Sequence, residues 1–372
     1  MVRTLHINTE RGWRGGELQT LCLARGLRKQ GIEAEIVAPP GAPLVGRARA
    51  EGIHVHETRM ASEASAVAIS SLARIVRRGR YDLVHAHTTH AHLLGALACR
   101  LAGSVPFVVT RRVDFTIHRQ AFAYLKYLIP IDRLVAISRA VRDVLIEDGI
   151  PPERIDVVHS GIDPDRYRVA NAEGPRESLG IPPDAVVVLN VAALVGHKDH
   201  ETLLAAMPRI LARHPRACLL VAGEGPLRSR LEARARGLGL DRDHVRFLGL
   251  RSDLGALFAL ARVFVLSSQL EGLCTSVLDA MALELPVVAT AAGGVPELVE
   301  DRRSGRLVPV RDPRALGEAV ADVLADPDAA RAWGRRGRAI VLDRFRVESM
   351  VEGNLAVYRR VWAARGHSLG TL

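Results

Sequence analysis

The chain has 372 residues, of which 48% are hydrophobic and 25% are charged. This composition is typical of a globular protein long enough for two domains, and it excludes an intrinsically disordered chain. The formal net charge of +10 favours anionic partners, but only 4% of the residues are aromatic, which argues against a nucleic-acid-binding surface that stacks bases.

Short β-branched runs alternate with amphipathic segments along the whole chain, which is the pattern of strand–helix–strand units and parallel sheets. The first half is expected to form strands at 4–8, 34–39, 53–57, 82–87, 106–110, 133–138 and 155–159. A segment rich in Pro, Gly and polar residues at 161–185 is interpreted as an interdomain linker. The second half is expected to form strands at 185–192, 217–223, 244–249, 263–268 and 286–290. The sequence therefore predicts two doubly wound α/β domains.

In such sheets, ligands bind beyond the carboxyl ends of the strands, so the loops that follow strands carry the candidate residues. Gly15 and Gly16 follow the first strand at the point where a helix begins. Adjacent glycines let the backbone approach a ligand closely, and a new helix offers free N–H groups to an anion. The spacing does not match the glycine pattern of nicotinamide-binding folds. A simple flexible loop is the alternative.

A histidine-rich stretch, "HAHTTHAH", occupies residues 85–92. Strand alternation places His85 and His87 on one face, while His90 and His92 lie past a turn. No carboxylate or cysteine completes a metal-ligand spacing, so we predict no metal. His87, at the end of its strand, is expected to point into the site.

Three loops of the second half add candidates. Lys198 follows the first strand of this half, and a lysine there neutralises a phosphate as a point charge unless it is an ordinary surface residue. Gly223 lies in a Gly-x-Gly turn, which is suited to backbone contacts with a ligand but is also a common turn. Arg251 follows a later strand in "FLGLRSDL".

The stretch "SSQLEGLCTSVLDAMALELP", residues 267–286, offers two carboxylates. Glu271 lies in the loop after a buried strand and suits hydrogen bonding to ligand hydroxyls. Thr275 and Ser276 open a helix whose amides favour a phosphate. Ser276 and Asp279 match a capping box, so Asp279 is either a helix cap, a ligand to the substrate, or both.

The four cysteines are widely spread and form no CxxC pair, which argues against a disulfide framework and a zinc cluster. The chain shows no run of about 18 apolar residues and no signal-peptide pattern at its N-terminus. We therefore expect a cytoplasmic protein.

Taken in order, these stretches resemble the family 4 retaining glycosyltransferases of the GT-B fold, and the resemblance covers almost the whole chain. The most specific part is 263–299, which is similar to the family block E-x7-E followed by A-M-A, P-V-V-A-T and G-G-x-P-E. "RGGELQTL", "DLVHAH", "VVHSGID", "ALVGHKD" and "VAGEGPLRSRLE" complete the order.

The resemblance implies two Rossmann-like domains that face a central cleft. The first, acceptor-side domain would comprise 1–162 together with a helix at 346–372 that crosses back to it, and Tyr358 and Trp362 are expected to anchor this helix. The second, nucleotide-sugar-binding domain would comprise 163–345. The resemblance further implies retaining transfer of a sugar from a nucleoside diphosphate donor, with no metal and no cofactor.

The resemblance also implies roles for individual residues. Lys198 would face the diphosphate, helped by Thr275, Ser276, Gly15 and Gly16. Glu271 would bond sugar hydroxyls, Asp279 the ribose, and Arg251 the base or ribose, while Gly223 would contact the donor. His87 would face the sugar and the acceptor. The residues assigned to catalysis are therefore Glu271, His87 and Lys198.

The chain departs from the family pattern at informative positions. The arginine five residues before the lysine is Ala193 here, so Lys198 and helix amides act alone, or Arg14, Arg111 or Arg112 substitutes. The second acid of the family block is Asp279, one methylene shorter than glutamate. Arg111 stands where many relatives have histidine, which suggests an acidic or phosphorylated acceptor near Arg111 and Arg112.

The leading hypothesis is a glycosyltransferase of cell-envelope or lipopolysaccharide biogenesis that acts on a glycan or lipid-linked acceptor. The basic and aromatic segment 110–128 either lies on an anionic membrane or packs within its domain. Two alternatives stay open: a sugar-nucleotide-binding protein with impaired catalysis, suggested by Ala193 and Asp279, and a GT-B sugar-nucleotide epimerase.

Overall fold

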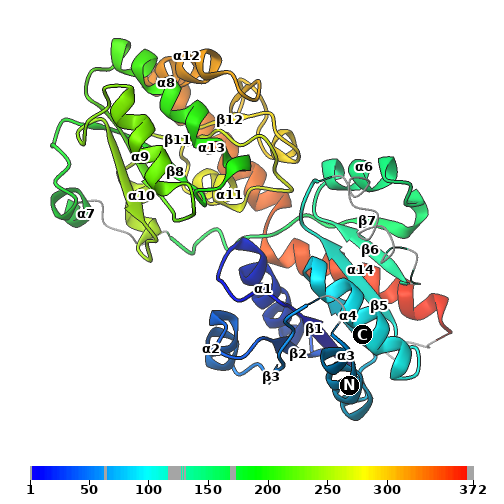
Figure 1. Cartoon of the computed structure of the whole chain (residues 1–372). Coiled ribbons are helices and arrows are strands. Elements are labelled where there is room, and N and C mark those ends of the chain that lie inside the picture. Colours follow the sequence, from blue (N-terminus) through cyan, green and yellow to red (C-terminus); the bar gives the residue numbers. More distant parts are fainter. Residues whose placement is uncertain are drawn as a thin grey trace. The chain divides into compact units, whose positions relative to one another are not determined.

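The structure, a computed structural model, describes residues 2–62, 65–115, 127, 129, 131–167 and 173–366. The chain divides into two compact units. Unit 1 comprises Met1–Gly161 and Val347–Leu372, and unit 2 comprises Ile162–Arg346. The boundaries expected from the sequence differ from these by one residue at each joint. Each unit is an α/β body built on its own parallel sheet (Figure 1).

Unit 1 contains a seven-stranded sheet in the order β3-β2-β1-β4-β5-β6-β7. Its strands are β1 (Arg3–Ile7), β2 (Glu33–Ala38), β3 (Val55–Glu57), β4 (Leu83–Ala86), β5 (Phe107–Arg111), β6 (Arg133–Ala136) and β7 (Ile155–Val157). The chain builds outward from β1 to β3 and then returns to place β4 on the other side of β1. The strand order therefore reverses between β1 and β4, and the loops after these two strands diverge there.

The helices of unit 1 are α1 (Gly15–Lys29), α2 (Pro43–Ala50), α3 (Ala66–Gly79), α4 (Thr89–Leu101), α6 (Arg139–Glu147), the short η1 (Pro152–Arg154) and α14 (Val347–Ala364). Local sequence sets several of their starts. Ser65, Thr88 and Ser138 precede α3, α4 and α6, and each side-chain oxygen accepts a backbone N–H from the first turn.

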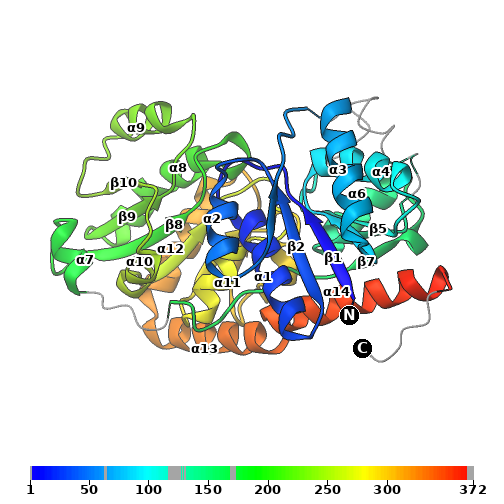
Figure 2. The same cartoon turned by 90° about the horizontal axis from the view of Figure 1, so that it is seen from below.

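The last helix, α14, belongs to unit 1 although it follows unit 2 in the sequence. The helix packs beside α1 (Figure 2). Its apolar residues join the core to which α1, α2 and the sheet contribute. Tyr358 and Trp362 are fully buried, and Trp362 Nε1 donates a hydrogen bond to the Asp82 carbonyl at 2.9 Å. The predicted return of the C-terminal helix, anchored by these aromatic residues, is confirmed.

Unit 2 contains a six-stranded parallel sheet in the order β10-β9-β8-β11-β12-β13. Its strands are β8 (Val186–Val191), β9 (Ala217–Ala222), β10 (Val245–Gly249), β11 (Val263–Leu266), β12 (Val287–Thr290) and β13 (Gly305–Val308). The strand order reverses between β8 and β11. The strand β13 was not predicted from the sequence; it is a short edge strand that begins with glycine and carries Arg306.

The helices of unit 2 are α7 (Glu173–Ser178), η2 (Gly196–Lys198), α8 (His200–Arg213), α9 (Arg228–Gly237), α10 (Leu254–Leu260), α11 (Thr275–Ala282), η3 (Val295–Glu297), α12 (Pro313–Ala325) and α13 (Pro327–Arg344). The interpretation of 161–185 as a linker was wrong in its described part. Ile162 pairs with Arg346, α7 forms within the segment, and the described residues 162–167 and 173–185 belong to unit 2.

The structure also describes the cysteines and the apolar character of the helices. The four cysteines are buried and none forms a disulfide. In the part of the chain that the structure describes, no helix combines the length and the apolar character that crossing a bilayer requires. Residues 116–126, the centre of the segment considered for membrane contact, lie outside the described residues.

Candidate functional site

Lys198 and Glu271 meet at the point where the strand order of unit 2 reverses. Lys198 lies in the loop after β8, Glu271 lies in the loop after β11, and these strands are neighbours in the sheet. Lys198 Nζ donates to Glu271 Oε1 at 2.5 Å, and Ser268 Oγ donates to the same oxygen at 2.6 Å. Glu271 is only 6% exposed. Two residues that the sequence analysis assigned to one site are thus brought into contact.

Further bonds hold the two loops together. Gln269 N donates to the His197 carbonyl at 2.8 Å, and Ser267 Oγ donates to the Lys198 carbonyl at 3.0 Å. Asp199 adopts a left-handed backbone conformation, with a φ of 47°, and its carboxylate accepts the N–H of Thr202 at the start of α8. The position of Lys198 is therefore set by backbone bonds on both sides and not by its side chain alone.

Asp279 does not cap α11, so the capping-box interpretation was wrong. The helix begins at Thr275, its N-cap residue is Cys274, and no side chain caps it. Asp279 lies within the helix, is 8% exposed, and its Oδ1 has no hydrogen-bond partner among the described residues. Burial raises the pKa of this carboxyl to about 7, against the opposing charge of Arg166. A buried carboxylate oxygen with no partner is what a ligand hydroxyl would satisfy.

Replacing Asp279 with asparagine is expected to stabilise the free protein more at pH 8 than at pH 5. Between the unfolded pKa of 3.8 and the folded value of about 7, the folded state keeps a proton that the unfolded chain releases. Wild-type stability is therefore lost as the pH rises through this window, whereas asparagine has no such proton. The advantage of the variant should grow by on the order of 2 kcal/mol between pH 5 and pH 8.

Thermal unfolding of both proteins at the two pH values measures this difference. The matched control is Asp343→Asn, because Asp343 is exposed on α13 and should leave the pH dependence of stability unchanged. An equal stability difference between wild type and Asp279→Asn at both pH values would contradict the buried titration.

The remaining candidates of unit 2 lie in the loops after its strands and in the first turn of α11. Gly223 has a φ of 152°, and a Cβ there would lie 1.9 Å from the Ala192 carbonyl oxygen, so glycine is needed for the loops after β8 and β9 to touch. Arg251 Nε and Nη2 donate to the two carboxylate oxygens of Asp253 at 2.8 and 2.6 Å. Ser276 Oγ lies 3.2 Å from Cys274 Sγ in the first turn of α11.

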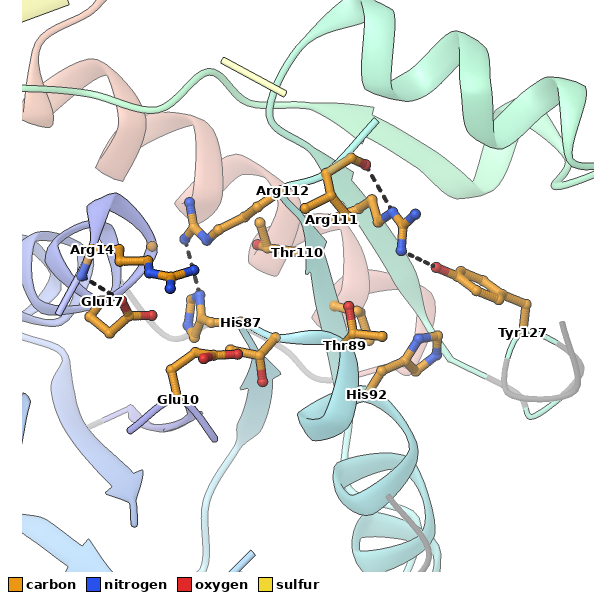
Figure 3. Close-up of a pocket in the computed structure, with 14 residues that line it drawn as sticks. Glu10, Arg14, Glu17, His87, Thr89, His92, Thr110, Arg111, Arg112 and Tyr127 are labelled. Carbon is orange, nitrogen blue, oxygen red and sulfur yellow. Dashed lines mark hydrogen bonds between the residues drawn. The ribbon is translucent and has the colours of Figure 1, made fainter. Parts of the chain in front are cut away.

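Unit 1 contains a cavity of about 210 Å³ beside its own reversal of strand order (Figure 3). The loops after β1 and β4, the starts of α1 and α4, and the end of β5 enclose it. The lining residues are Glu10, Arg14, Gly16, Glu17, His87, Thr88, Thr89, His92, Val109, Thr110, Arg111, Arg112, Val113 and Tyr127. His87, Gly16 and the two arginines that the sequence assigned to the acceptor side, Arg111 and Arg112, therefore line one cavity.

The two acceptor-side arginines differ in what they bind. Arg111 Nε and Nη2 donate to the carbonyls of Val113 and Phe115 at 3.0 and 2.7 Å, and Nη1 lies 3.5 Å from the Tyr127 hydroxyl. Arg111 therefore holds its own loop. Arg112 instead extends toward His87 (Figure 3).

The glycine loop starts a helix as expected. Gly15 and Gly16 form the first residues of α1, and Glu17 Oε2 accepts the Arg14 N–H at 2.8 Å. A Cβ on Gly16 would lie 3.6 Å from the Arg112 Cδ, which is an ordinary contact. The Arg112 side chain therefore packs close to the start of α1 at Gly16, but this contact does not require a glycine at position 16.

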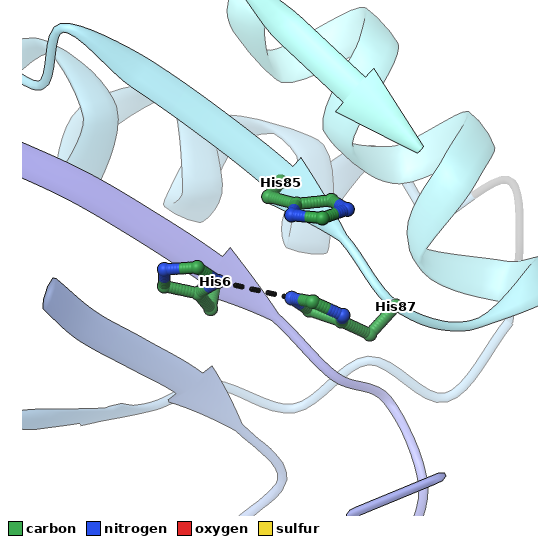
Figure 4. Close-up of side chains that lie close together, drawn as sticks. All are labelled: His6, His85 and His87. Atoms are coloured by element: carbon green, nitrogen blue, oxygen red, sulfur yellow. Dashed lines mark hydrogen bonds between the residues drawn. The ribbon is translucent and has the colours of Figure 1, made fainter. Parts of the chain in front are cut away.

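Three buried histidines, His6, His85 and His87, lie together beneath the cavity with ring nitrogens within 4.8 Å of one another (Figure 4). His85 shares hydrogen bonds with the Tyr358 hydroxyl at 2.6 Å and the Thr110 hydroxyl at 2.7 Å. Burial lowers the pKa of all three rings, that of His6 to about 3. A metal would have to displace the hydrogen bonds these ring nitrogens already make, and the expected lack of a metal requirement stays a prediction.

Several residues at these sites were missed in the sequence analysis. His6 bonds His87 from a strand 81 positions earlier, and Ser268 donates to Glu271. Burial, together with the charge of Asp279, raises the pKa of Tyr167 to about 12, which places Tyr167 near that carboxyl. For His6 and Ser268, the available signal was their place at the carboxyl end of a predicted strand. No local pattern marks Tyr167, which follows β7 by ten positions.

Two family profiles together match most of the chain. The one described as "Glycosyl transferases group 1" matches residues 172–340, and the one described as "Glycosyltransferase Family 4" matches residues 13–166. D-inositol 3-phosphate glycosyltransferase of Saccharomonospora viridis is 32% identical over 318 residues, and the match covers 78% of this chain and 73% of the relative.

Two further similarities extend the comparison. A GDP-mannose-dependent alpha-(1-6)-phosphatidylinositol monomannoside mannosyltransferase of Mycobacterium tuberculosis H37Rv is 34% identical over 213 residues, and the match covers 54% of each chain. The crystal structure of HepE from Anabaena in complex with UDP-glucose has a TM-score of 0.85 at 22% identity, with 97% of this chain and 100% of HepE covered. At that identity the likeness to HepE concerns the fold.

Proposed function

We propose that this chain, which belongs to the family 4 glycosyltransferases and has the GT-B fold, transfers a sugar from a nucleoside diphosphate donor with retention. The acceptor would be a hydroxyl of a cell-envelope glycan or of a lipid-linked molecule. The donor would bind unit 2, and the cavity of unit 1 would receive part of the acceptor or donor. The observation that carries the proposal is the contact of Lys198 with Glu271 at the strand reversal of unit 2.

The proposed chemistry is mainly electrostatic. Lys198 and the amides at the start of α11, near Thr275 and Ser276, supply positive potential to the leaving diphosphate. Glu271, held by Lys198 and Ser268, offers carboxylate oxygens to sugar hydroxyls. Because these groups stabilise the departing charge, the mechanism includes no metal and no cofactor. The diphosphate oxygen itself would take the proton of the acceptor hydroxyl.

The names of relatives support the substrate classes. One relative is described as GDP-mannose-dependent and the HepE structure contains UDP-glucose, so a sugar nucleotide is the shared donor class and the base differs. Two relatives are named for inositol phosphate and phosphatidylinositol acceptors, which carry a phosphate beside hydroxyls. These names motivate an envelope or lipid-linked acceptor. Contact of segment 110–128 with an anionic membrane stays a prediction, and flotation with anionic liposomes at two salt concentrations tests it.

A thermal-shift screen of UDP-, GDP- and ADP-sugars tests the proposal first, since a bound donor raises the melting temperature. The donor that binds is then incubated with candidate acceptors, and NMR of the product reports the anomeric configuration. Transfer with retention supports the proposal. Binding without any turnover would favour a sugar-nucleotide-binding protein with impaired catalysis, and conversion of the donor sugar without an acceptor would favour an epimerase.

A further inference from the structure

Arg112 is a cation in the cavity of unit 1 whose donors are largely unused. Its hydrogen bond within the described part of the chain runs from Nη2 to His87 Nδ1, at 3.4 Å. Nε is buried and has no hydrogen-bond partner there. Burial lowers the pKa of Arg112 to about 10, opposed by the charge of Glu17, so the guanidinium is still charged at neutral pH.

The charge of Glu17 acts on Arg112, but no carboxylate forms an ion pair with Arg112 among the residues that the structure describes. Glu17 accepts the Arg14 N–H, the Arg111 guanidinium holds its own loop, and Glu10 is exposed to solvent. Arg14 also lines the cavity, but it is exposed to solvent. Among the described residues, Arg112 is therefore the partly buried cation of this cavity whose hydrogen-bonding capacity is largely free.

Arg112 is partly exposed, but its Nε is buried, and leaving a buried part of a cation without an anion is unfavourable. An arginine fork with unused N–H donors matches the oxygens of a phosphate. The hydroxyls of Thr88 and Thr89 line the same cavity. We infer that Arg112 binds a phosphate group in the cavity of unit 1, and that His87 and His6 position its guanidinium. The inference rests on the proposed function for the source of the phosphate, which is either the donor diphosphate or a phosphorylated acceptor.

Hydrogen-bond directions fix how the histidines act. Arginine can only donate, so Nδ1 of His87 accepts and its Nε2 carries the proton. Nε2 then donates to His6 Nδ1 at 3.0 Å, and His6 Nε2 donates to the Thr4 hydroxyl at 3.1 Å. The Thr4 hydroxyl donates onward to the Glu33 carbonyl at 3.4 Å. This relay selects one tautomer of His87 and thereby aims Arg112, which makes His87 and His6 positioning residues.

The assignment changes what is expected of His87. Both of its ring nitrogens are occupied, one by Arg112 and one by His6. Its direct role toward a sugar, as predicted from the sequence, would require Arg112 to move. The hydrogen-bond relay instead leaves Arg112 as the residue that would contact the phosphate.

Calorimetric titration of the full chain with inorganic phosphate and, separately, with UDP tests the inference. Arg112→Gln is expected to weaken phosphate binding by about tenfold or more, and Arg112→Lys by less, because lysine keeps the charge but loses the fork. The matched control is Arg100→Gln, an exposed arginine on α4, which should bind phosphate like the wild type. Absence of saturable phosphate binding by the wild type, or equal binding by Arg112→Gln, would overturn the site.

The two titrations identify the source of the phosphate. If Arg112→Gln weakens UDP and inorganic phosphate by the same factor, the site holds the donor diphosphate. If UDP binding is unchanged while phosphate binding falls, the site holds the phosphate of the acceptor. If Arg112 does not affect phosphate binding but the protein still transfers sugar, the phosphate site is wrong and the proposed function stands. If phosphate binds at Arg112 but no sugar is transferred, the phosphate site stands and the proposed function is wrong.

His6 variants test the positioning role. His6→Val removes the acceptor for His87 Nε2 and is expected to raise the KM of the phosphate-bearing substrate more than it lowers kcat. His6→Asn places an amide oxygen near the lost Nδ1 and should restore much of the affinity for phosphate. If both variants only lower the melting temperature and leave phosphate affinity unchanged, His6 has no positioning role.

Discussion

Replacing Glu271 with alanine is expected to lower the rate of sugar transfer by about a hundredfold to a thousandfold, the range found when one preorganised transition-state contact is removed. The carboxylate would no longer accept the sugar hydroxyls. Lys198 would also lose the partner that holds its ammonium at 2.5 Å, so the cation aimed at the diphosphate would be displaced. The measurement is the initial rate of transfer with saturating donor.

Glu271→Gln separates the two effects, because it keeps the shape of the side chain and one acceptor oxygen while removing the charge that neutralises Lys198. Glu177→Ala, on the exposed surface of α7, is the matched control and should transfer at the wild-type rate. A wild-type rate for Glu271→Ala would remove Glu271 from the mechanism.

Because Lys198 and Glu271 touch, their substitutions should not be additive. The double variant Lys198→Ala, Glu271→Ala is expected to be little slower than the worse of the two single variants, since each single change already breaks the pair. Fully additive losses would mean that the two residues act on different steps and that their contact has no catalytic role.

Much of the fold was predictable because the sequence carries it locally. Strand after strand is a short apolar β-branched run, and the predicted runs 4–8 and 34–39 correspond to β1 and β2 within a residue. The edge strand β13 was missed because its glycine start and Arg306 interrupt the apolar pattern. The segment 162–185 was misread as a linker because its polar composition hides the pairing of Ile162 with Arg346, which is distant in sequence.

The candidate site was predictable only in part, for a physical reason. A strand-end rule locates Lys198 and Glu271 one at a time, but only the sheet order makes β8 and β11 neighbours and brings the two side chains together. Likewise, the sequence marks His87 and Arg112 but not the relay through His6 and Thr4. The capping box at Ser276 failed because the helix starts two residues earlier than the motif requires, which leaves Asp279 buried without a capping role.

The route of the chain has a consequence for folding. Unit 1 is completed by α14, which is made only after all of unit 2, so residues 1–161 lack part of their own core. The helix also reaches the histidine cluster, since the Tyr358 hydroxyl bonds His85 at 2.6 Å. Stability of unit 1 and the geometry beneath its cavity therefore depend on the same helix.

Trp362→Ala is accordingly expected to lower the free energy of unfolding by about 3–5 kcal/mol, the usual cost of truncating a buried aromatic residue. The side chain is 2% exposed, packs edge-on against Tyr358, and donates to the Asp82 carbonyl beside β4. Urea unfolding measures the loss, and Arg359→Ala, on the exposed face of α14, is the matched control.

Tyr358→Phe keeps the packing and removes only the hydroxyl that His85 binds, so it should cost about 1–3 kcal/mol, the penalty for leaving a buried polar group unpaired. If α14 completes unit 1, Trp362→Ala must be the more damaging change, because it loses both apolar contact and a hydrogen bond. If Trp362→Ala has the same free energy of unfolding as the wild type, the core of unit 1 does not depend on α14. The proposed dependence of the cavity on α14 would then also be wrong.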